Sequence, residues 1–176
     1  MVGCNVKLVD RMFGCSVHES TRTFGAFEYF MAVAAASFNN EIAAFVWALA
    51  LIKLPWVSKS LLVAALAPVL TVCIVFTLKA LISRERPALH KARGRVLKFD
   101  FRTREHSKSM PSGDSAQAAT FWTYMALRGL VTWQSAALFT SFTMAARVYY
   151  MCHYPSDTLV GAMLGAGVAL ALDYLL

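Results

Sequence analysis

Three short runs of the sequence place charged residues at the ends of apolar segments, where charge is costly and commonly serves a function. The runs are residues 79–87, 111–114 and 147–157. Their ionisable members include Lys79, Arg86, Asp114, Arg147, His153 and Asp157. Phosphoryl transfer requires fixed positive charge around the nonbridging oxygens, a nucleophile and assistance to the leaving oxygen. These residue types therefore predict a site for a phosphate ester.

Candidates for the phosphate-binding groups come from all three runs. Arg86 and Arg147 carry forked donors that match phosphate geometry, and Lys79 supplies a point charge. Ser112 and Gly113 stand at the expected start of a helix, where a hydroxyl and free backbone amides can face an anion. We expect these five residues to hold the phosphate.

His153 is the candidate nucleophile, and Asp157 lies four residues after it. A carboxylate at this distance can hold and polarise one imidazole nitrogen, which leaves the other nitrogen free to attack. A lone histidine in such a position is more often an ordinary interfacial residue. The matching distances to Arg147 and Asp157 favour the catalytic interpretation.

The composition is that of a membrane protein. The chain has 176 residues, of which 58% are hydrophobic and 15% charged, with a mean hydropathy of +0.53. Soluble domains have roughly 45–50% apolar and 25% charged residues. Because each span needs about 20 residues, the length predicts one compact bundle of five or six helices.

The positive charge is concentrated in one loop. Residues 84–109 contain nine basic and three acidic residues, a local charge of +6 in a chain of net charge +7. The loop lies between apolar segments and has few aromatic residues, which favours anionic head groups or phosphates over nucleic acid. The four cysteines show neither zinc-ligand spacing nor a disulfide framework.

The expected organisation is an N-terminal surface segment, residues 1–25, followed by a membrane-embedded domain, residues 26–176. The first segment is either an amphipathic surface helix or an unstructured terminus. Apolar or helical segments are expected at residues 27–38, 42–54, 61–78, 113–127, 131–146 and 158–176. Residues 27–38 are too few to span a bilayer alone. Gly161, Gly165 and Ala169 form a small-residue stripe that predicts close helix packing.

Alternating spans would bring the three charged runs to the same membrane face. The runs also resemble the motifs of the type 2 phosphatidic acid phosphatase family, membrane lipid phosphatases that share a helical fold with vanadium haloperoxidases. That family's pattern is Lys, six residues, Arg-Pro; then Pro-Ser-Gly-His; then Ser-Arg, five residues, His, three residues, Asp. The matching positions are Lys79, Arg86, Pro87, Pro111, Ser112, Gly113, Arg147, His153 and Asp157. Two positions differ, with Asp114 in place of His and Ala146 in place of Ser.

The resemblance implies an all-α, multi-pass transmembrane bundle of the acid phosphatase and vanadium haloperoxidase type. It implies that His153 forms a phosphohistidine, that Asp157 orients it, and that Asp114 occupies the place of the leaving-group acid. No metal or other cofactor is expected. The short chain and compact loops are most like the small polyisoprenoid and presqualene diphosphate phosphatases.

Asp114 bears on the choice of substrate. A carboxyl group with an ordinary pKa of roughly 3.9 is ionised at neutral pH and repels a phosphate, unless burial or the phosphate itself keeps it protonated. An alkoxide needs a proton to leave, whereas a diphosphate expels a phosphate whose second pKa is roughly 6. The residue therefore favours an isoprenoid diphosphate as substrate over other lipid phosphates.

Two other classes of function stay open at this stage. One is a catalytically inactive membrane scaffold that binds lipid phosphates, and the other is a transporter. Arg84 and Glu85 are interpreted as a solvated ion pair. The basic loop favours a cytosolic site, but the same charges can serve the substrate. The expected location is the endoplasmic reticulum membrane in a eukaryote or the plasma membrane in a bacterium, and the oligomeric state is left open.

Overall fold

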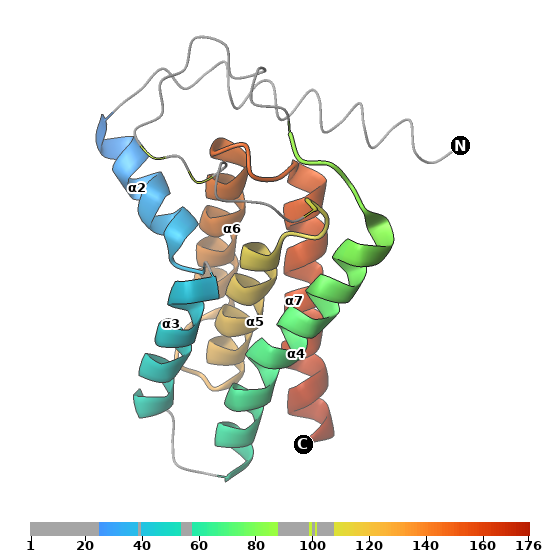
Figure 1. Cartoon of the computed structure of the whole chain (residues 1–176). Helices are drawn as coiled ribbons and strands as arrows, with labels where there is room; N and C mark the ends of the chain where they lie inside the picture. Colours follow the sequence, from blue (N-terminus) through green and yellow to red (C-terminus); the bar gives the residue numbers. More distant parts are fainter. Residues whose placement is uncertain (1–24, 39, 54–57, 88–98, 100, 102–107) are drawn as a thin grey trace.

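The computed structural model describes residues 25–38, 40–53, 58–87, 99, 101 and 108–176. These residues form the helices α2 (Gly25–Ala36), α3 (Asn40–Lys53), α4 (Ser58–Ile82), α5 (Gly113–Leu127), α6 (Trp133–Tyr149) and α7 (Pro155–Leu175). The predicted all-α bundle is confirmed for this part of the chain (Figure 1). The predicted surface segment, residues 1–25, falls outside the described residues except for its last position.

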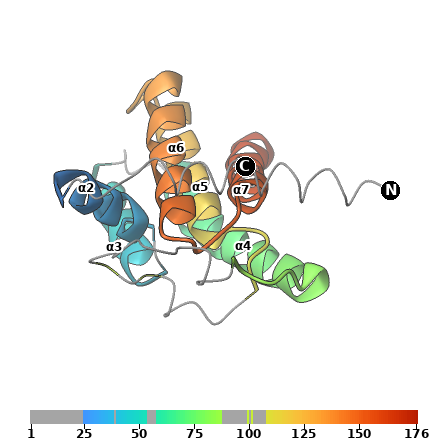
Figure 2. The same ribbon diagram turned by 90° about the horizontal axis from the view of Figure 1, so that it is seen from above.

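Helix α5 is the centre of the bundle. It packs against α4, α6 and α7, and Figure 2 shows it between α6 and α7. Small residues make this central position possible, because Ala116, Ala118 and Ala119 are almost completely buried and let the neighbouring backbones approach. Helices α2 and α3 follow one another down the other side of the bundle (Figure 1).

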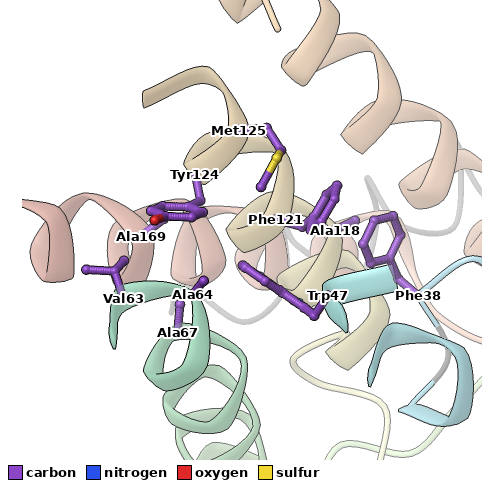
Figure 3. Close-up of a cluster of buried hydrophobic side chains, with 10 residues drawn as sticks. All are labelled: Phe38, Trp47, Val63, Ala64, Ala67, Ala118, Phe121, Tyr124, Met125 and Ala169. Carbon is purple, nitrogen blue, oxygen red and sulfur yellow. The ribbon is translucent and has the colours of Figure 1, made fainter. Parts of the chain in front are cut away.

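The principal apolar core lies on the faces of α5 that meet α3, α4 and α7. Figure 3 shows Trp47 of α3 and Phe121 of α5 side by side, with ring centroids 5.1 Å apart in an edge-to-face arrangement. The remaining buried members are Phe38, Val63, Ala64, Ala67, Ala118, Tyr124, Met125 and Ala169. This core fixes α5 against its neighbours, and α5 begins at the candidate site.

The predicted small-residue stripe of α7 is confirmed as a close-packing surface. A Cβ atom at Gly161 would lie 2.3 Å from the Ser112 carbonyl oxygen, and one at Gly165 would lie 2.0 Å from the Ala116 carbonyl oxygen. Real side chains do not tolerate such distances, so α5 and α7 approach this closely only because both residues are glycine. The contact holds the start of α5 against the second and third turns of α7.

Two of the described helices are long and apolar enough to cross a bilayer, over Leu62–Ile82 and Pro155–Leu175. Large apolar side chains on them face outward, including Val69 and Phe76 on α4 and Met163 on α7. Such an outer surface suits lipid better than water. The number of times the chain crosses the membrane stays a prediction.

Several helix ends differ from the sequence-based boundaries, among them two that hold candidate site residues. Helix α4 continues past Lys79 to Ile82, so Lys79 lies in its last turn instead of after it. Helix α7 begins at Pro155, because proline is favoured in a first turn. Asp157 therefore lies within the first turn of α7 instead of in the preceding loop.

Candidate active site

The three charged runs meet at one end of the bundle. Helices α4 and α6 run toward this end and α5 and α7 run away from it (Figure 1). The Arg86 guanidinium donates to the Cys152 carbonyl at 2.7 Å, which joins the first run to the third. The Ser112 amide donates to the Asp157 carbonyl at 3.0 Å, which joins the second run to the third. The predicted convergence of the runs is confirmed.

His153 is buried, with 3% of its surface exposed, in the turn between α6 and α7. Its Nδ1 atom lies 2.7 Å from the Ser109 carbonyl oxygen, and its Nε2 atom lies 3.1 Å from Nη1 of Arg86. A carbonyl only accepts and a guanidinium only donates, so Nδ1 carries the proton and Nε2 presents its lone pair. The contacts thus assign the tautomer in which Nδ1 is protonated and the lone pair is on Nε2.

Burial lowers the pKa of His153 from 6.5 to about 4. The nearby Asp157 carboxylate opposes this shift, whereas the charges of Arg147, Arg86 and Lys79 add to it. The imidazole is therefore neutral at physiological pH, the form required of a nucleophile. The same three cations make the space around His153 attractive to an anion.

Asp157 is fully buried, and its two carboxylate oxygens have different partners. Oδ2 accepts the Tyr154 amide at 2.9 Å, which caps α7. Oδ1 accepts from Nη1 of Arg84 at 2.8 Å. Nδ1 of His153 lies 3.7 Å from Oδ2, so the Ser109 carbonyl is the nearer of the two acceptors.

All three candidate phosphate-binding cations are buried at this end of the bundle. Arg147 is 1% exposed, Lys79 8% and Arg86 9%. Long cationic side chains seldom stay this buried without a partner of opposite charge or an anionic ligand. Lys79 reaches the site from the last turn of α4, Arg147 from the last turn of α6 and Arg86 from the segment after α4.

Ser112 has a structural role at the start of α5 in addition to the phosphate contact that we predict for it. Its hydroxyl oxygen caps α5, accepting from the Ser115 amide at 3.4 Å and the Ser115 hydroxyl at 3.0 Å. Its own amide is occupied by Asp157. Gly113 is the first residue of α5, so its amide belongs to the group that has no acceptor within the helix.

Asp114 is buried and forms an ion pair with Arg147, with Oδ2 2.7 Å from Nε. The two atoms form an ion pair and not an aligned hydrogen bond. The sequence did not indicate this contact, which depends on how α5 and α6 pack. As a result, one of the three cations already faces a carboxylate.

The interpretation of Arg84 and Glu85 as a solvated pair is wrong for Arg84. Its guanidinium bonds Asp157 and Ser156 and stacks on the Tyr154 ring at 4.2 Å, while Glu85 is exposed. Ser83 has a positive φ of 48°, which turns the chain sharply after α4. The spacing between Lys79 and Arg86 does not indicate this turn, so the role of Arg84 could not be predicted from the sequence. Among the residues described, no group of three or more His, Cys, Asp or Glu could hold a metal ion.

The fold has counterparts among solved structures. A PAP2 type phosphatidylglycerolphosphate phosphatase from Bacillus subtilis aligns at 19% identity with a TM-score of 0.72, over 98% of this chain and 86% of that one. LpxE from Aquifex aeolicus aligns at 21% identity with a TM-score of 0.69, over 94% of this chain and 93% of that one.

A search of curated protein sequences gives no significant match. The sequence profile of the PAP2 superfamily, by contrast, matches residues 58–175. That range extends from the start of α4 to the end of α7 and contains every residue of the site described above. The chain therefore belongs to the PAP2 superfamily.

Proposed function

We propose that the protein is a multi-pass membrane lipid phosphate phosphatase that acts through a phosphohistidine at His153. The observation that carries the proposal is the neutral, buried imidazole whose Nε2 lone pair meets Arg86, with Lys79 and Arg147 adding positive charge. Membership of the PAP2 superfamily supports it, as does the phosphatase activity named for the Bacillus subtilis protein. The membrane is the endoplasmic reticulum if the source is eukaryotic and the plasma membrane if it is bacterial.

In the first step, the nonbridging oxygens of the substrate take over the donors of Arg86, and Nε2 of His153 attacks phosphorus. An N–P bond forms as the bond to the leaving oxygen breaks, and its electron pair goes to that oxygen. The Nδ1 proton stays on the ring, held by the Ser109 carbonyl and near Asp157. Both acceptors stabilise the positive charge that the ring gains on phosphorylation.

In the second step, water attacks the phosphohistidine. The N–P bond breaks, its electron pair returns to Nε2, and inorganic phosphate leaves as the water proton passes to solvent. Lys79, Arg86 and Arg147 stabilise the charge that develops on the phosphoryl oxygens in both steps. Gly113 adds its amide at the start of α5.

The substrate class that we propose is an isoprenoid diphosphate. The Arg147 guanidinium lies 2.7 Å from the Asp114 carboxylate and favours its ionised form, which makes Asp114 a poor acid. When a diphosphate is cleaved, the leaving group is a lipid monophosphate, which needs little protonation. When a monophosphate is cleaved, the leaving group is an alkoxide, which needs a proton. The ion pair therefore strengthens the preference inferred from the Asp114 substitution.

The test is phosphate release from a panel of lipid phosphates and diphosphates by the purified protein in detergent. His153→Ala should abolish release, and an acid-labile phosphoenzyme should be trapped in the parent and not in the variant. Asp157→Asn should reduce release strongly. Substantial turnover by His153→Ala would remove the proposed nucleophile.

One observation favours a second candidate function, an inactive scaffold that binds lipid phosphate. The Asp114 carboxylate competes with phosphate for Arg147, and an enzyme that has lost its acid could retain binding alone. Absence of turnover in both the parent and Asp114→His on every lipid phosphate tried would favour the scaffold. Recovery of activity in Asp114→His alone would show a site disabled at one position.

A further inference from the structure

Arg84 lies outside the residues that match the family motifs, yet its guanidinium lies within the site. Nη1 donates to Oδ1 of Asp157 at 2.8 Å and to the Ser156 hydroxyl at 2.8 Å. The guanidinium carbon lies 4.2 Å from the centre of the Tyr154 ring. These three contacts all lie within residues 154–157, at the start of α7, so one side chain holds the first turn of that helix.

The backbone of the same residue reaches the other partner of His153. The Ser109 amide donates to the Arg84 carbonyl at 2.8 Å, and the Ser109 hydroxyl donates to the Glu85 carbonyl at 3.1 Å. The Ser109 carbonyl then accepts from Nδ1 of His153 at 2.7 Å. Arg84 is thus connected, through its side chain and through its backbone, to both acceptors beside Nδ1.

We propose that Arg84 is a positioning residue that holds the Asp157 carboxylate beside Nδ1 of His153 and supplies its counter-charge. The inference rests on the proposed function of His153 as a nucleophile. The role proposed for Arg84 is positioning and not phosphate binding, because Nη1 donates to Asp157 and Ser156 and the guanidinium stacks on the Tyr154 ring.

The physical basis is the burial of Asp157. A carboxylate with no exposed surface is strongly destabilised unless it is paired. If Arg84 is removed, the nearest group able to neutralise Asp157 is the imidazole itself, at 3.7 Å. The carboxylate would then favour protonation of His153, and a protonated imidazole cannot attack phosphorus.

Several charged groups surround His153, and they set the size of this effect. The cations are Lys79 from α4, Arg86 from the segment after it and Arg147 from α6, and the carboxylates are Asp114 from α5 and Asp157 from α7. The cations lower the pKa of His153, and the Asp157 carboxylate raises it. Loss of the Arg84 charge leaves the Asp157 charge less neutralised, so the pKa of His153 should rise. We expect the acid limb of kcat/KM to move to higher pH in Arg84→Gln.

The first experiment compares Arg84→Gln and Arg84→Lys with Arg128→Gln as the control. Arg128 forms an ion pair with Asp173 at the opposite end of the bundle and stacks on Tyr124, so it matches the chemistry without touching the site. Arg84→Gln should lower kcat about 10²-fold, the loss typical of a misplaced catalytic group, with little change in KM. Arg84→Lys should retain most of the parent's kcat, and Arg128→Gln should have the same kcat and KM as the parent.

A double-mutant cycle with Asp157→Asn tests whether Arg84 acts through Asp157. In the Asp157→Asn background position 157 carries no charge for Arg84 to neutralise, so Arg84→Gln should cause no further loss. This double variant also avoids misfolding from an unpaired carboxylate. Additive losses would overturn the proposal. A rise in KM with unchanged kcat would also overturn it, because it would identify Arg84 as a phosphate ligand.

A spectroscopic measurement separates this proposal from the proposed function. In protein labelled with ¹⁵N-histidine, the His153 signals can be assigned with His153→Gln, since the other histidines are His18, His90 and His106. In the parent, the His153 signals should show a protonated Nδ1 and an unprotonated Nε2 at neutral pH. In Arg84→Gln, His153 should titrate at higher pH than in the parent. Identical titrations would overturn the role of Arg84, whereas an inactive parent with the expected shift would overturn only the proposed function.

Discussion

At the scale of single residues, the orientation of His153 depends on backbone groups as much as on its expected carboxylate partner. The Ser109 carbonyl accepts a hydrogen bond from Nδ1 at 2.7 Å, and the Met151 backbone adopts a positive φ of 56° in the turn that leads to His153. The Cys152 and His153 amides both return to the Arg147 carbonyl, at 3.0 and 3.3 Å. The imidazole and the Arg147 cation are thus fixed by one compact turn.

The first prediction concerns pH. Burial, reinforced by three cations, lowers the pKa of His153 to about 4, so the proposed nucleophile stays neutral well below pH 6.5. Activity should fall only as the pH decreases toward that pKa, because protonation occupies Nε2. A profile of kcat/KM from about pH 4 to about pH 8 measures this limb.

Ionisation of the substrate phosphate falls in the same range, with a pKa of roughly 6, so the profile needs a control. Lys79→Gln removes a like charge near His153 and should move the enzyme's limb to higher pH, while the substrate's ionisation stays where it was. Coincident limbs for parent and variant would show that the profile reports the substrate alone.

The second prediction concerns Asp114. The parent should hydrolyse a polyisoprenyl diphosphate faster than the corresponding monophosphate, because the poorer leaving group depends more on protonation. Asp114→His should narrow that difference by raising monophosphate turnover, since a neutral or cationic imidazole no longer pairs with Arg147. Initial rates on the two substrates measure the ratio, and an unchanged ratio would exclude a role for position 114 in leaving-group departure.

Much of the site could be predicted from spacing, because Lys79, Arg86 and His153 lie at the fixed ends of apolar helices. Arg84 could not, since its contact with Asp157 depends on the left-handed backbone of Ser83. The Ser109 carbonyl carries no side-chain signal at all. The ion pair between Asp114 and Arg147 depends on the packing of two helices, which spacing along one chain does not define.

At the scale of helices, the site is assembled from termini. The last turns of α4 and α6 bring Lys79 and Arg147, and the first turns of α5 and α7 bring Asp114 and Asp157. Pro68 in the middle of α4 is tolerated beside α5, where the Gln117 side chain donates to its carbonyl at 2.9 Å. The predicted start and end of α5 are confirmed, since Ser112 is an N-cap and Gly129 follows the helix with a positive φ of 69°.

Helix α2 packs against the end of α6, next to the site. The Tyr150 hydroxyl donates to the Glu28 carbonyl at 3.0 Å, and Phe27 meets the Tyr149 ring edge-to-face at 5.7 Å. Phe101 also packs on Tyr150, with ring centroids 4.7 Å apart. Both tyrosines are buried, and they join α2 to the turn that carries His153.

The third prediction concerns the contact of α5 with α7. Gly165→Ala would place a Cβ 2.0 Å from the Ala116 carbonyl oxygen, and a backbone atom cannot move aside without separating the helices. We expect a loss of about 1–3 kcal/mol in the free energy of unfolding, as for other overpacked positions. Thermal unfolding in detergent measures the change.

The control for this variant is Gly167→Ala on the same helix. A Cβ at Gly167 meets nothing within 4 Å, so alanine should be neutral or should stabilise α7 by about 0.5–1 kcal/mol through helix propensity. Equal melting temperatures for the two variants would show that the α5–α7 contact is looser than the packed arrangement requires.

At the scale of the whole molecule, the catalytic candidates all lie at one end of a bundle whose outer surface is apolar. Helices α4 and α7 are long and apolar enough to span a bilayer. Helices α2 and α3 follow one another along the height of the bundle (Figure 1), which suggests how two short helices could accompany one long span. The site would then lie at the level of lipid head groups, where a phosphate and its apolar chain separate into two environments.

The final prediction is that the two ends of the bundle face opposite sides of the membrane. Lys108 is exposed beside the site, and Gln134 is exposed in the first turn of α6 at the other end. Lys108→Cys and Gln134→Cys, each in a background whose four native cysteines are replaced by serine, should react with an impermeant maleimide from opposite sides of sealed vesicles. Labelling after permeabilisation confirms that each thiol is accessible.

If both react from one side before permeabilisation, the bundle does not cross the bilayer as proposed. If they react from opposite sides, the side that labels Lys108→Cys is the side of the phosphatase site. That result also shows whether the +6 charge of residues 84–109 follows the positive-inside rule or instead serves an anionic substrate on the outer side.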